Sequence, residues 1–303
     1  MDKTAKRRKA DKRKLRVIIA LLLLCVAAAV YILLHFGRSG ADDPGIPAED
    51  TSTEESTEIS AEDEEAIAAG KAASHVYSHR GSQGDDELTF AAYDRAIEAG
   101  SKFIEADIVV SGSGTIYLAH DDHALEMTGY DGYFSGMTDA QISELKTRAG
   151  NNIVKLSELF EKYGDSVTYL IDIKYASSRN ITAFTEIVRE YGLEENVIAA
   201  SFYFNALKPL EDTFPDMTKL IICTDQETFD VALGLSYVDI ICVPKEMMTA
   251  DNLDEAHAHE KGFSVWTLNT EEEIRKAIEL GVDSYFTDDS GLAIRLEKEL
   301  RAE

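Results

Sequence analysis

The chain has 303 residues, of which 45% are hydrophobic, so it is long enough for a large core and too long for a single small module. Its formal net charge of -26 argues against nucleic acid as a partner for most of the protein, because binding phosphates requires a basic surface. The charge is unevenly spread, since residues 1–16 carry nine Lys and Arg against two Asp.

An uncharged apolar run extends from Val17 to Leu34. As a helix these residues would span about 27 Å, nearly the thickness of a bilayer core. The basic residues before the run are expected to stay in the cytoplasm, which places everything after it outside the cell. A cleaved signal peptide is the alternative, but its apolar region is usually shorter and is followed by a small-residue cleavage site, which is not found here.

The residues after this run are rich in Asp, Glu, Ser and Thr and nearly lack large apolar side chains, which predicts a disordered stalk. The predicted organisation is a basic cytoplasmic tail (1–16), a transmembrane helix (17–36), an acidic stalk (37–70) and a large folded domain (71–303). We therefore expect a single-pass protein of the cell membrane, with its folded domain outside the cell.

Short runs rich in β-forming residues begin at Val76 and alternate with segments of helical periodicity that end at glycine. The predicted strands cover residues 75–79, 103–110, 115–120, 167–175, 197–204, 219–224, 239–244, 263–268 and 284–289. The third follows the second after only four residues, too few for a parallel crossover, and is expected to form a β-hairpin with it. The other eight predict an α/β fold, the TIM (β/α)8 barrel, with its active site at the C-terminal ends of the strands.

Charged residues inside two predicted strands indicate where that site lies. Alternation directs Glu105 and Asp107 to one face of their strand, opposite the apolar Ile104, and it likewise directs Asp172 and Lys174 inward. Buried charges are costly unless they are paired or bound to a metal, and carboxylates suit a hard cation such as Mg²⁺ or Ca²⁺. A structural salt-bridge network involving Lys174 is the alternative.

Two histidines, His79 and His120, stand at the ends of predicted strands, where each is followed by a charged residue, Arg80 or Asp121. Because histidine titrates near neutral pH, one imidazole can accept a proton from a nucleophile while the other donates one to a leaving alkoxide. An arginine and a divalent cation would stabilise the negative charge that develops on a phosphate. Metal-assisted cleavage of a phosphodiester is the chemistry that this set favours.

These residues occur in segments that resemble the glycerophosphodiester phosphodiesterases over roughly residues 76–290. In chain order, the segments are "HRG" (79–81), "ELTFAAY" (87–93), "IEADIVVSGSGTIYLAHD" (104–121), "LIDIK" (170–174), "SF" (201–202), "VWTLN" (265–269) and "GVDSYFTDD" (281–289). No single segment is decisive, but the ordered set is specific.

The resemblance implies metal-dependent hydrolysis of glycerophosphodiesters to an alcohol and glycerol 3-phosphate. The implied roles are an acid–base pair (His79, His120), contacts to the substrate (Arg80, Lys174, Trp266) and ligands of Ca²⁺ or Mg²⁺ (Glu105, Asp107, Asp172). The implied nucleophile is the substrate's own glycerol 2-hydroxyl, and the sequence does not distinguish this from direct attack by water. Lysolipids, glycerol-phosphate polymers or binding without turnover are the alternatives.

The chain departs from the family pattern at two informative positions. Asp172 stands where a longer Glu is usual, which affects how it could reach a metal ion, and Leu88 stands where Asn is common. Trp266 is as compatible with a place in the core as with contact to glycerol. Cys223 and Cys242 lie in successive predicted strands and are expected to be buried free thiols.

Overall fold

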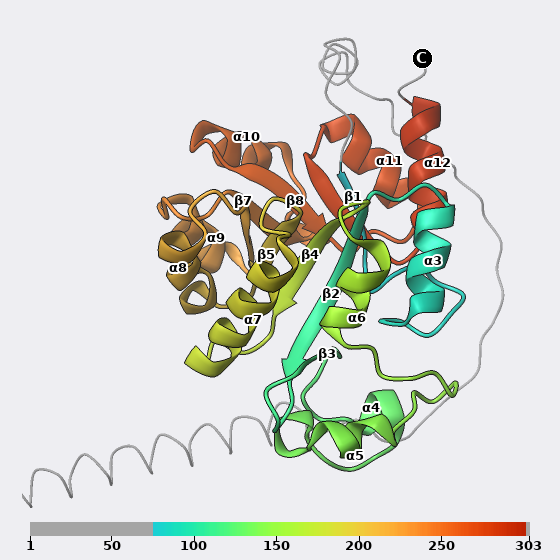
Figure 1. The fold of residues 1–303 in the computed structure, drawn as a ribbon. Helices are drawn as coiled ribbons and strands as arrows, with labels where there is room; N and C mark the ends of the chain where they lie inside the picture. Colours follow the sequence, from blue (N-terminus) through green and yellow to red (C-terminus); the bar gives the residue numbers. More distant parts are fainter. Residues whose placement is uncertain (1–74, 301–303) are drawn as a thin grey trace, which may run out of the picture. The chain divides into compact units, whose positions relative to one another are not determined.

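The computed structural model describes residues 75–300, drawn in colour in Figure 1. The predicted cytoplasmic tail, transmembrane helix and stalk lie outside these residues. Within the described part, no helix is both long and apolar enough to cross a membrane.

The strands of the described part form one closed sheet. They are β1 (His75–Ser78), β2 (Phe103–Val110), β3 (Ile116–Leu118), β4 (Thr168–Ile173), β5 (Val197–Ser201), β6 (Lys219–Ile222), β7 (Ile240–Pro244), β8 (Gly262–Trp266) and β9 (Ser284–Thr287). All except β3 pair in parallel, and β1 closes the ring by pairing with both β2 and β9. The predicted TIM barrel is thereby confirmed. The remaining strand, β3, pairs antiparallel with the end of β2, with Ile108 opposite Leu118.

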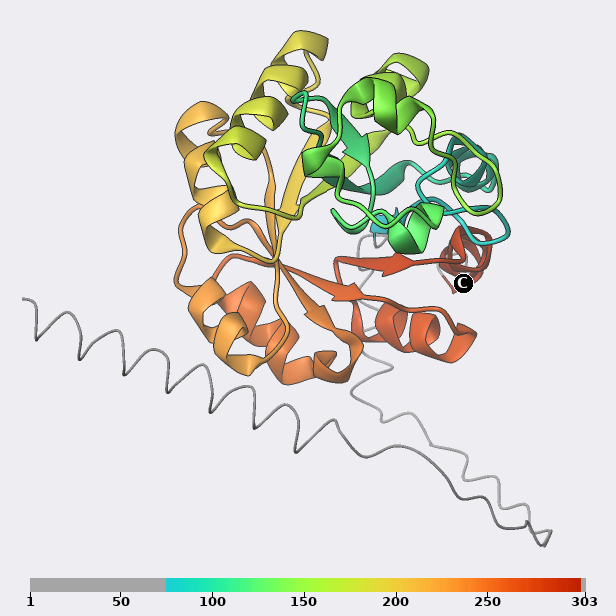
Figure 2. The same ribbon diagram turned by 90° about the horizontal axis from the view of Figure 1, so that it is seen from below.

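Helices surround the barrel, and Figure 2 shows them as a ring outside the strands. They are α3 (Phe90–Glu98), α6 (Leu156–Tyr163), α7 (Ser178–Tyr191), α8 (Phe204–Thr213), α9 (Gln226–Leu233), α10 (Ala250–Ala258), α11 (Glu271–Leu280) and α12 (Ser290–Leu300), with a 3-10 turn η2 (Lys245–Met247) before α10. Local sequence sets several of their ends. The side chain of Thr270 caps the start of α11, and Gly281 ends it in the left-handed conformation that glycine adopts without strain.

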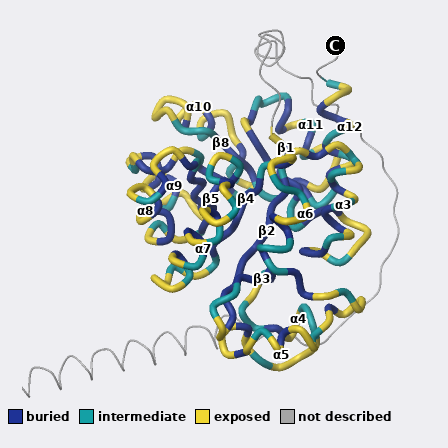
Figure 3. Tube along the Cα trace, viewed as in Figure 1, coloured by how far each residue is buried: buried dark blue, intermediate teal, exposed yellow. Residues whose placement is uncertain are grey.

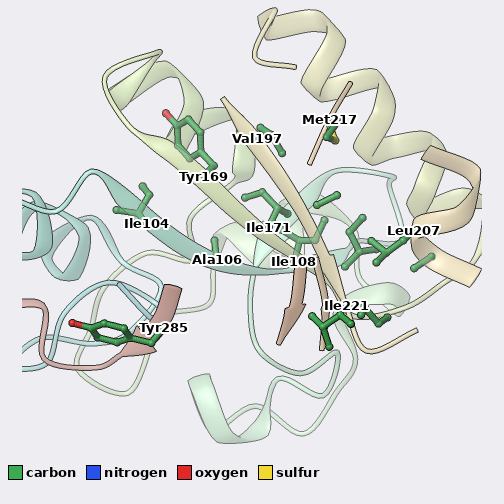
Figure 4. Packing of buried hydrophobic residues seen from close by; sticks show 14 of the residues in the cluster. Ile104, Ala106, Ile108, Tyr169, Ile171, Val197, Leu207, Met217, Ile221 and Tyr285 are labelled. Atoms are coloured by element: carbon green, nitrogen blue, oxygen red, sulfur yellow. The ribbon is translucent and has the colours of Figure 1, made fainter. Parts of the chain in front are cut away.

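The side chains of β2 alternate between two environments. Ile104, Ala106 and Ile108 belong to the hydrophobic cluster between the strands and the helices, part of which Figure 4 shows. Glu105 and Asp107 point to the barrel interior, as alternation predicts. Figure 3 shows the strands as the most deeply buried part of the fold. Each large apolar side chain buried in this way contributes about 1.5–3 kcal/mol to folding, which offsets the cost of burying charge inside the barrel.

Residues 119–155, here called the insertion, separate β3 from α6. They contain α4 (Leu125–Thr128), a 3-10 turn η1 (Phe134–Gly136) and α5 (Asp139–Ser143). Phe134 and Ile142 of the insertion pack with Val109 of β2 and Tyr117 of β3 in a separate hydrophobic cluster. Figure 1 shows α4 and α5 beyond the arrowhead of β2, at the C-terminal end of the barrel. The sequence patterns do not predict this subdomain, because its helices are too short to show a helical period.

Candidate active site

Three carboxylates lie buried inside the barrel. Glu105 and Asp107 come from β2 and Asp172 from β4, and Asp107 and Asp172 are direct partners in the parallel register. Each of the three residues is at most 2% exposed. Two of the residues that the sequence nominated as metal ligands, Asp107 and Asp172, therefore lie side by side, and Glu105 precedes Asp107 by two residues on the same face of β2.

Two cations pair with these carboxylates. Lys174 Nζ lies 2.7 Å from Asp107 Oδ1 and 2.7 Å from Asp172 Oδ2. Arg80 Nε lies 2.9 Å from Asp107 Oδ2, although the direction is not that of a hydrogen bond, and its Nη1 lies 3.1 Å from Glu87. The backbone N–H of Arg80 also donates to Glu105 Oε2 at 2.8 Å. This is the ion-pair network that the sequence left open as an alternative, and it holds both predicted phosphate contacts at the mouth.

Burial governs the protonation of this cluster. It raises the pKa of Glu105, and the neighbouring charge of Asp107 raises it further. Burial also raises the pKa of Asp172, an effect that Lys174 opposes and Asp107 reinforces. For Lys174, burial disfavours the ammonium form, but the two aspartates outweigh it and the pKa is raised. The interior thus holds three carboxyl groups against two cations.

Within residues 75–300, no group of three or more His, Cys, Asp or Glu side chains is gathered closely enough to hold a metal ion. The donor set nevertheless fits a hard divalent cation chemically. Its carboxylates outnumber its cations, and the buried Asp172 Oδ1 has no hydrogen-bond partner. A bound divalent cation would offset the excess negative charge and would give Asp172 Oδ1 a partner.

His79 follows β1 and is oriented by a residue from the opposite end of the domain. Its Nδ1 lies 2.6 Å from Oδ1 of Asp288, which follows β9. Asn269, after β8, holds Asp288 in turn: its Nδ2 donates to Asp288 Oδ2 at 2.5 Å, and its Oδ1 accepts the backbone N–H of Asp288 at 2.9 Å. Burial disfavours protonation of His79, but the bond to Asp288 and the charge of Glu105 outweigh it and raise the pKa.

Asp288 and Asn269 were missed as functional residues by the sequence analysis, although both lie in segments quoted for the resemblance. Each is polar and stands just after a barrel strand. That same signal singled out His79 and His120, and it would have found these two residues as well.

His120 lies at the start of the insertion, where its Nδ1 is 3.1 Å from Asp121 Oδ2. It lines a cavity of about 320 Å³ together with Arg80, Glu87 and Leu88. The side chain of His120 is 41% exposed, so it can meet a ligand that enters this space. The structure thus places one predicted acid–base residue and one predicted phosphate contact in the same cavity.

Trp266, the last residue of β8, is half-buried and packs edge-on against Phe202, with ring centroids 5.9 Å apart. Its Nε1 donates to the carbonyl of Cys223 at 3.4 Å, and it does not line the cavity that holds His120. The packing role that the sequence left open is therefore present. Cys223 and Cys242 are free and buried, as predicted.

The loop between β1 and α3 needs unusual backbone geometry to bring these groups together. Gly81 has a φ of 101°, and a Cβ added there would lie 2.5 Å from the Cβ of Ala92. Glycine is required at this position for both reasons. It lets the chain turn sharply after Arg80 and pass close to α3.

Comparison with known proteins identifies similar chains along the whole barrel. Residues 79–292 match the model of the glycerophosphoryl diester phosphodiesterase family. A glycerophosphodiester phosphodiesterase of Caldanaerobacter subterraneus is 29% identical over 238 residues, which cover 73% of this chain and 96% of the relative.

Two solved structures share the fold. A glycerophosphodiester phosphodiesterase from Agrobacterium tumefaciens superposes with a TM-score of 0.66 at 20% identity, covering 74% of this chain and 99% of its own. A phosphodiesterase from Oleispira antarctica, solved in complex with the product sn-glycerol-3-phosphate, has a TM-score of 0.66 at 19% identity, covering 77% of this chain and 99% of its own.

Proposed function

The chain belongs to the glycerophosphoryl diester phosphodiesterase family and is an enzyme of this type, and from that premise we propose how it acts. It cleaves a glycerophosphodiester to an alcohol and glycerol 3-phosphate, with His79 and His120 as its acid–base pair. The observation that carries this proposal is that His79 and Arg80 lie beside the buried carboxylate cluster at the mouth of the barrel, and that His120 shares a cavity with Arg80.

The geometry supports a proton-transfer role for His79. With Nδ1 engaged by the carboxylate of Asp288, the favoured neutral tautomer carries its proton on Nδ1, which leaves Nε2 as the proton acceptor. His120 is oriented similarly, through Nδ1 and Asp121. One imidazole then takes the proton of the attacking hydroxyl, and the other protonates the departing alcohol. The nucleophile is either the 2-hydroxyl of the glycerol or a water molecule.

Glu105, Asp107 and Asp172 are the residues that would hold Ca²⁺ or Mg²⁺. A bound divalent cation supplies positive charge that polarises the phosphoryl oxygens. Arg80 and Lys174 add positive charge at the same mouth, where they also orient the carboxylates. Trp266 offers a half-buried aromatic face at the end of β8 for the glycerol.

Release of glycerol 3-phosphate tests this function directly. Purified protein is incubated with glycerophosphocholine or glycerophosphoglycerol in the presence of Ca²⁺, Mg²⁺ or a chelator, and the product is measured. We expect release with a cation and its loss with the chelator. His79→Ala and His120→Ala should each lower turnover by about 10²–10⁴-fold, the usual contribution of a positioned acid–base group.

His259→Ala is the matched control, because this histidine stands exposed at the end of α10 and contacts only its own helix turn. Near-normal turnover in His79→Ala or His120→Ala would remove that residue from the mechanism. Choline released from a lysolipid, with no glycerol 3-phosphate from either diester, would favour the lysolipid alternative instead.

The protein is further proposed to act on the outer face of the cell membrane. The basic tail of residues 1–16 and the apolar run of residues 17–34 support this orientation. The substrate would then be a small glycerophosphodiester outside the cell.

A further inference from the structure

We propose that the space between the insertion and the barrel mouth is a subsite that selects a leaving alcohol carrying a positive charge, of the quaternary ammonium class. This inference rests on the proposed function, because it concerns the alcohol that the same site releases. It assigns a role to insertion residues that the catalytic proposal does not use.

Two cavities make up this space. The first, of about 320 Å³, contains Arg80 and His120, and the second, of about 630 Å³, extends along the insertion to Tyr133 and Tyr175. They share four lining residues, Asp121, His123, Glu126 and Arg148. An alcohol leaving from beside His120 therefore enters a space whose walls come largely from the insertion.

The charge of the walls favours a cation. Carboxylates outnumber guanidinium groups by five to two among the residues that line the two cavities: Asp86, Glu87, Asp121, Asp122 and Glu126 against Arg80 and Arg148. Arg148 is directed at the backbone, since its Nε donates to the carbonyl of Glu126 at 2.6 Å and its Nη2 to that of Leu125 at 2.9 Å. An anionic headgroup would meet net repulsion here.

Glu126 is the carboxylate placed to meet that cation. Asp86 and Asp122 accept hydrogen bonds from neighbouring side chains, and Asp121 pairs with His120. The carboxylate of Glu126 is exposed and makes no hydrogen bond or ion pair with any residue in the described part of the chain. Its charge is therefore available to a ligand.

Aromatic side chains supply the second half of the recognition. Tyr133 is 59% exposed and Tyr175 42%, and both line the larger cavity. His123 stacks on Tyr133 with ring centroids 4.8 Å apart. The hydroxyl of Tyr175 accepts a hydrogen bond from the backbone N–H of Asp122 at 3.4 Å. Each tyrosine is thus in contact with another residue that lines the larger cavity. Exposed aromatic faces beside carboxylates are the usual surroundings of a bound quaternary ammonium group.

The test compares a cationic leaving group with a neutral one on the purified full-length chain. The quantity measured is kcat/KM for glycerophosphocholine divided by kcat/KM for glycerophosphoglycerol. We expect Glu126→Gln and Tyr133→Leu each to lower this ratio roughly two- to fivefold, because an exposed charge pair or cation–π contact is worth that much. Tyr133→Phe, which keeps the ring face, should preserve it.

Glu144→Gln is the matched control, since Glu144 is an exposed acid of the insertion that lines neither cavity. An unchanged ratio in both Glu126→Gln and Tyr133→Leu overturns the subsite and leaves the proposed function standing. Titration of the protein with choline alone, followed by NMR, distinguishes failure of the subsite from failure of the proposed function. Choline binding that weakens in Glu126→Gln, in a protein that releases no glycerol 3-phosphate, would support the subsite and overturn the function.

Discussion

Arg80 and Leu88 both have a φ near 60°, a backbone conformation that residues with side chains rarely adopt. Each costs on the order of 1 kcal/mol, which the surroundings must offset. For Leu88 the offset is complete burial, and Asn, which is common at this position in the family, would tolerate the geometry at less cost. For Arg80 the left-handed turn lets one residue contact Glu105 through its backbone and Asp107 through its side chain.

Asp288 is expected to be a positioning residue for His79. Asp288→Asn keeps the shape of the contact but removes the charge that raises the pKa of His79. We expect kcat to fall about 10- to 100-fold, and the limb of the pH–rate profile that belongs to His79 to move to lower pH. A fall in kcat without movement of either limb would contradict this role. Asp289→Asn is the neighbouring control, because Asp289 contacts Gln83 and the start of α12 but not His79.

The same pair links stability to pH. The hydrogen bond to His79 lowers the pKa of Asp288 below its usual 3.8, so the stabilisation from Asp288 is present above pH 3.8 and is lost as the pH falls through the lowered value. The pKa of His79 is raised above 6.5, so its stabilisation is present below pH 6.5 and is lost as the pH rises through the raised value. The pair stabilises the fold most between these two limits.

At the scale of elements, Asp86 links the loop between β1 and α3 to the insertion through hydrogen bonds. Its Oδ2 accepts hydrogen bonds from Thr147 Oγ1 and from Asn151 Nδ2, both in the insertion. Asp86 and Thr147 also line the cavity that contains Arg80 and His120. The contact therefore sets the spacing between the elements that carry these two residues.

Asp86→Ala should loosen this junction. We expect the free energy of unfolding to fall by about 1–2 kcal/mol, the usual loss for hydrogen bonds to a carboxylate, and KM to rise. Denaturant unfolding and steady-state kinetics measure the two effects. The adjacent Asp85 pairs with Arg95 near the surface, so Asp85→Ala should change stability by less than about 1 kcal/mol. Equal effects of Asp86→Ala and Asp85→Ala on stability and KM would show that Asp86 does not link the loop to the insertion.

At the scale of the whole molecule, the barrel could be predicted because its strands are short, apolar and separated by helical periods. Strand alternation also located Glu105, Asp107 and Asp172 correctly, since it depends only on neighbouring residues. The bond between His79 and Asp288 could not be predicted in this way, because it joins residues 209 positions apart. The pairing of Lys174 with Asp107 depends in the same way on the register of β2 against β4, whereas its pairing with Asp172 joins residues two positions apart.

The proposed orientation predicts that a protease outside the cell can cleave the catalytic domain from its membrane anchor. Protease added to intact cells should remove the domain of residues 71–303 while leaving the basic tail protected, because residues 17–36 would cross the membrane. A cytoplasmic protein should stay intact in the same cells. Recovery of the domain in the medium without any protease would favour a cleaved signal peptide, and protection of the whole chain would contradict the orientation.

The closure of the barrel by its first and last strands also bears on synthesis. β1 pairs along its whole length with β9, and His79 gains its partner only from the residue that follows β9. A chain that stops before β9 therefore lacks the strand against which β1 pairs along its whole length. It has neither a closed barrel nor the partner that orients the imidazole of His79, so this arrangement can form only after Asp288 has been made.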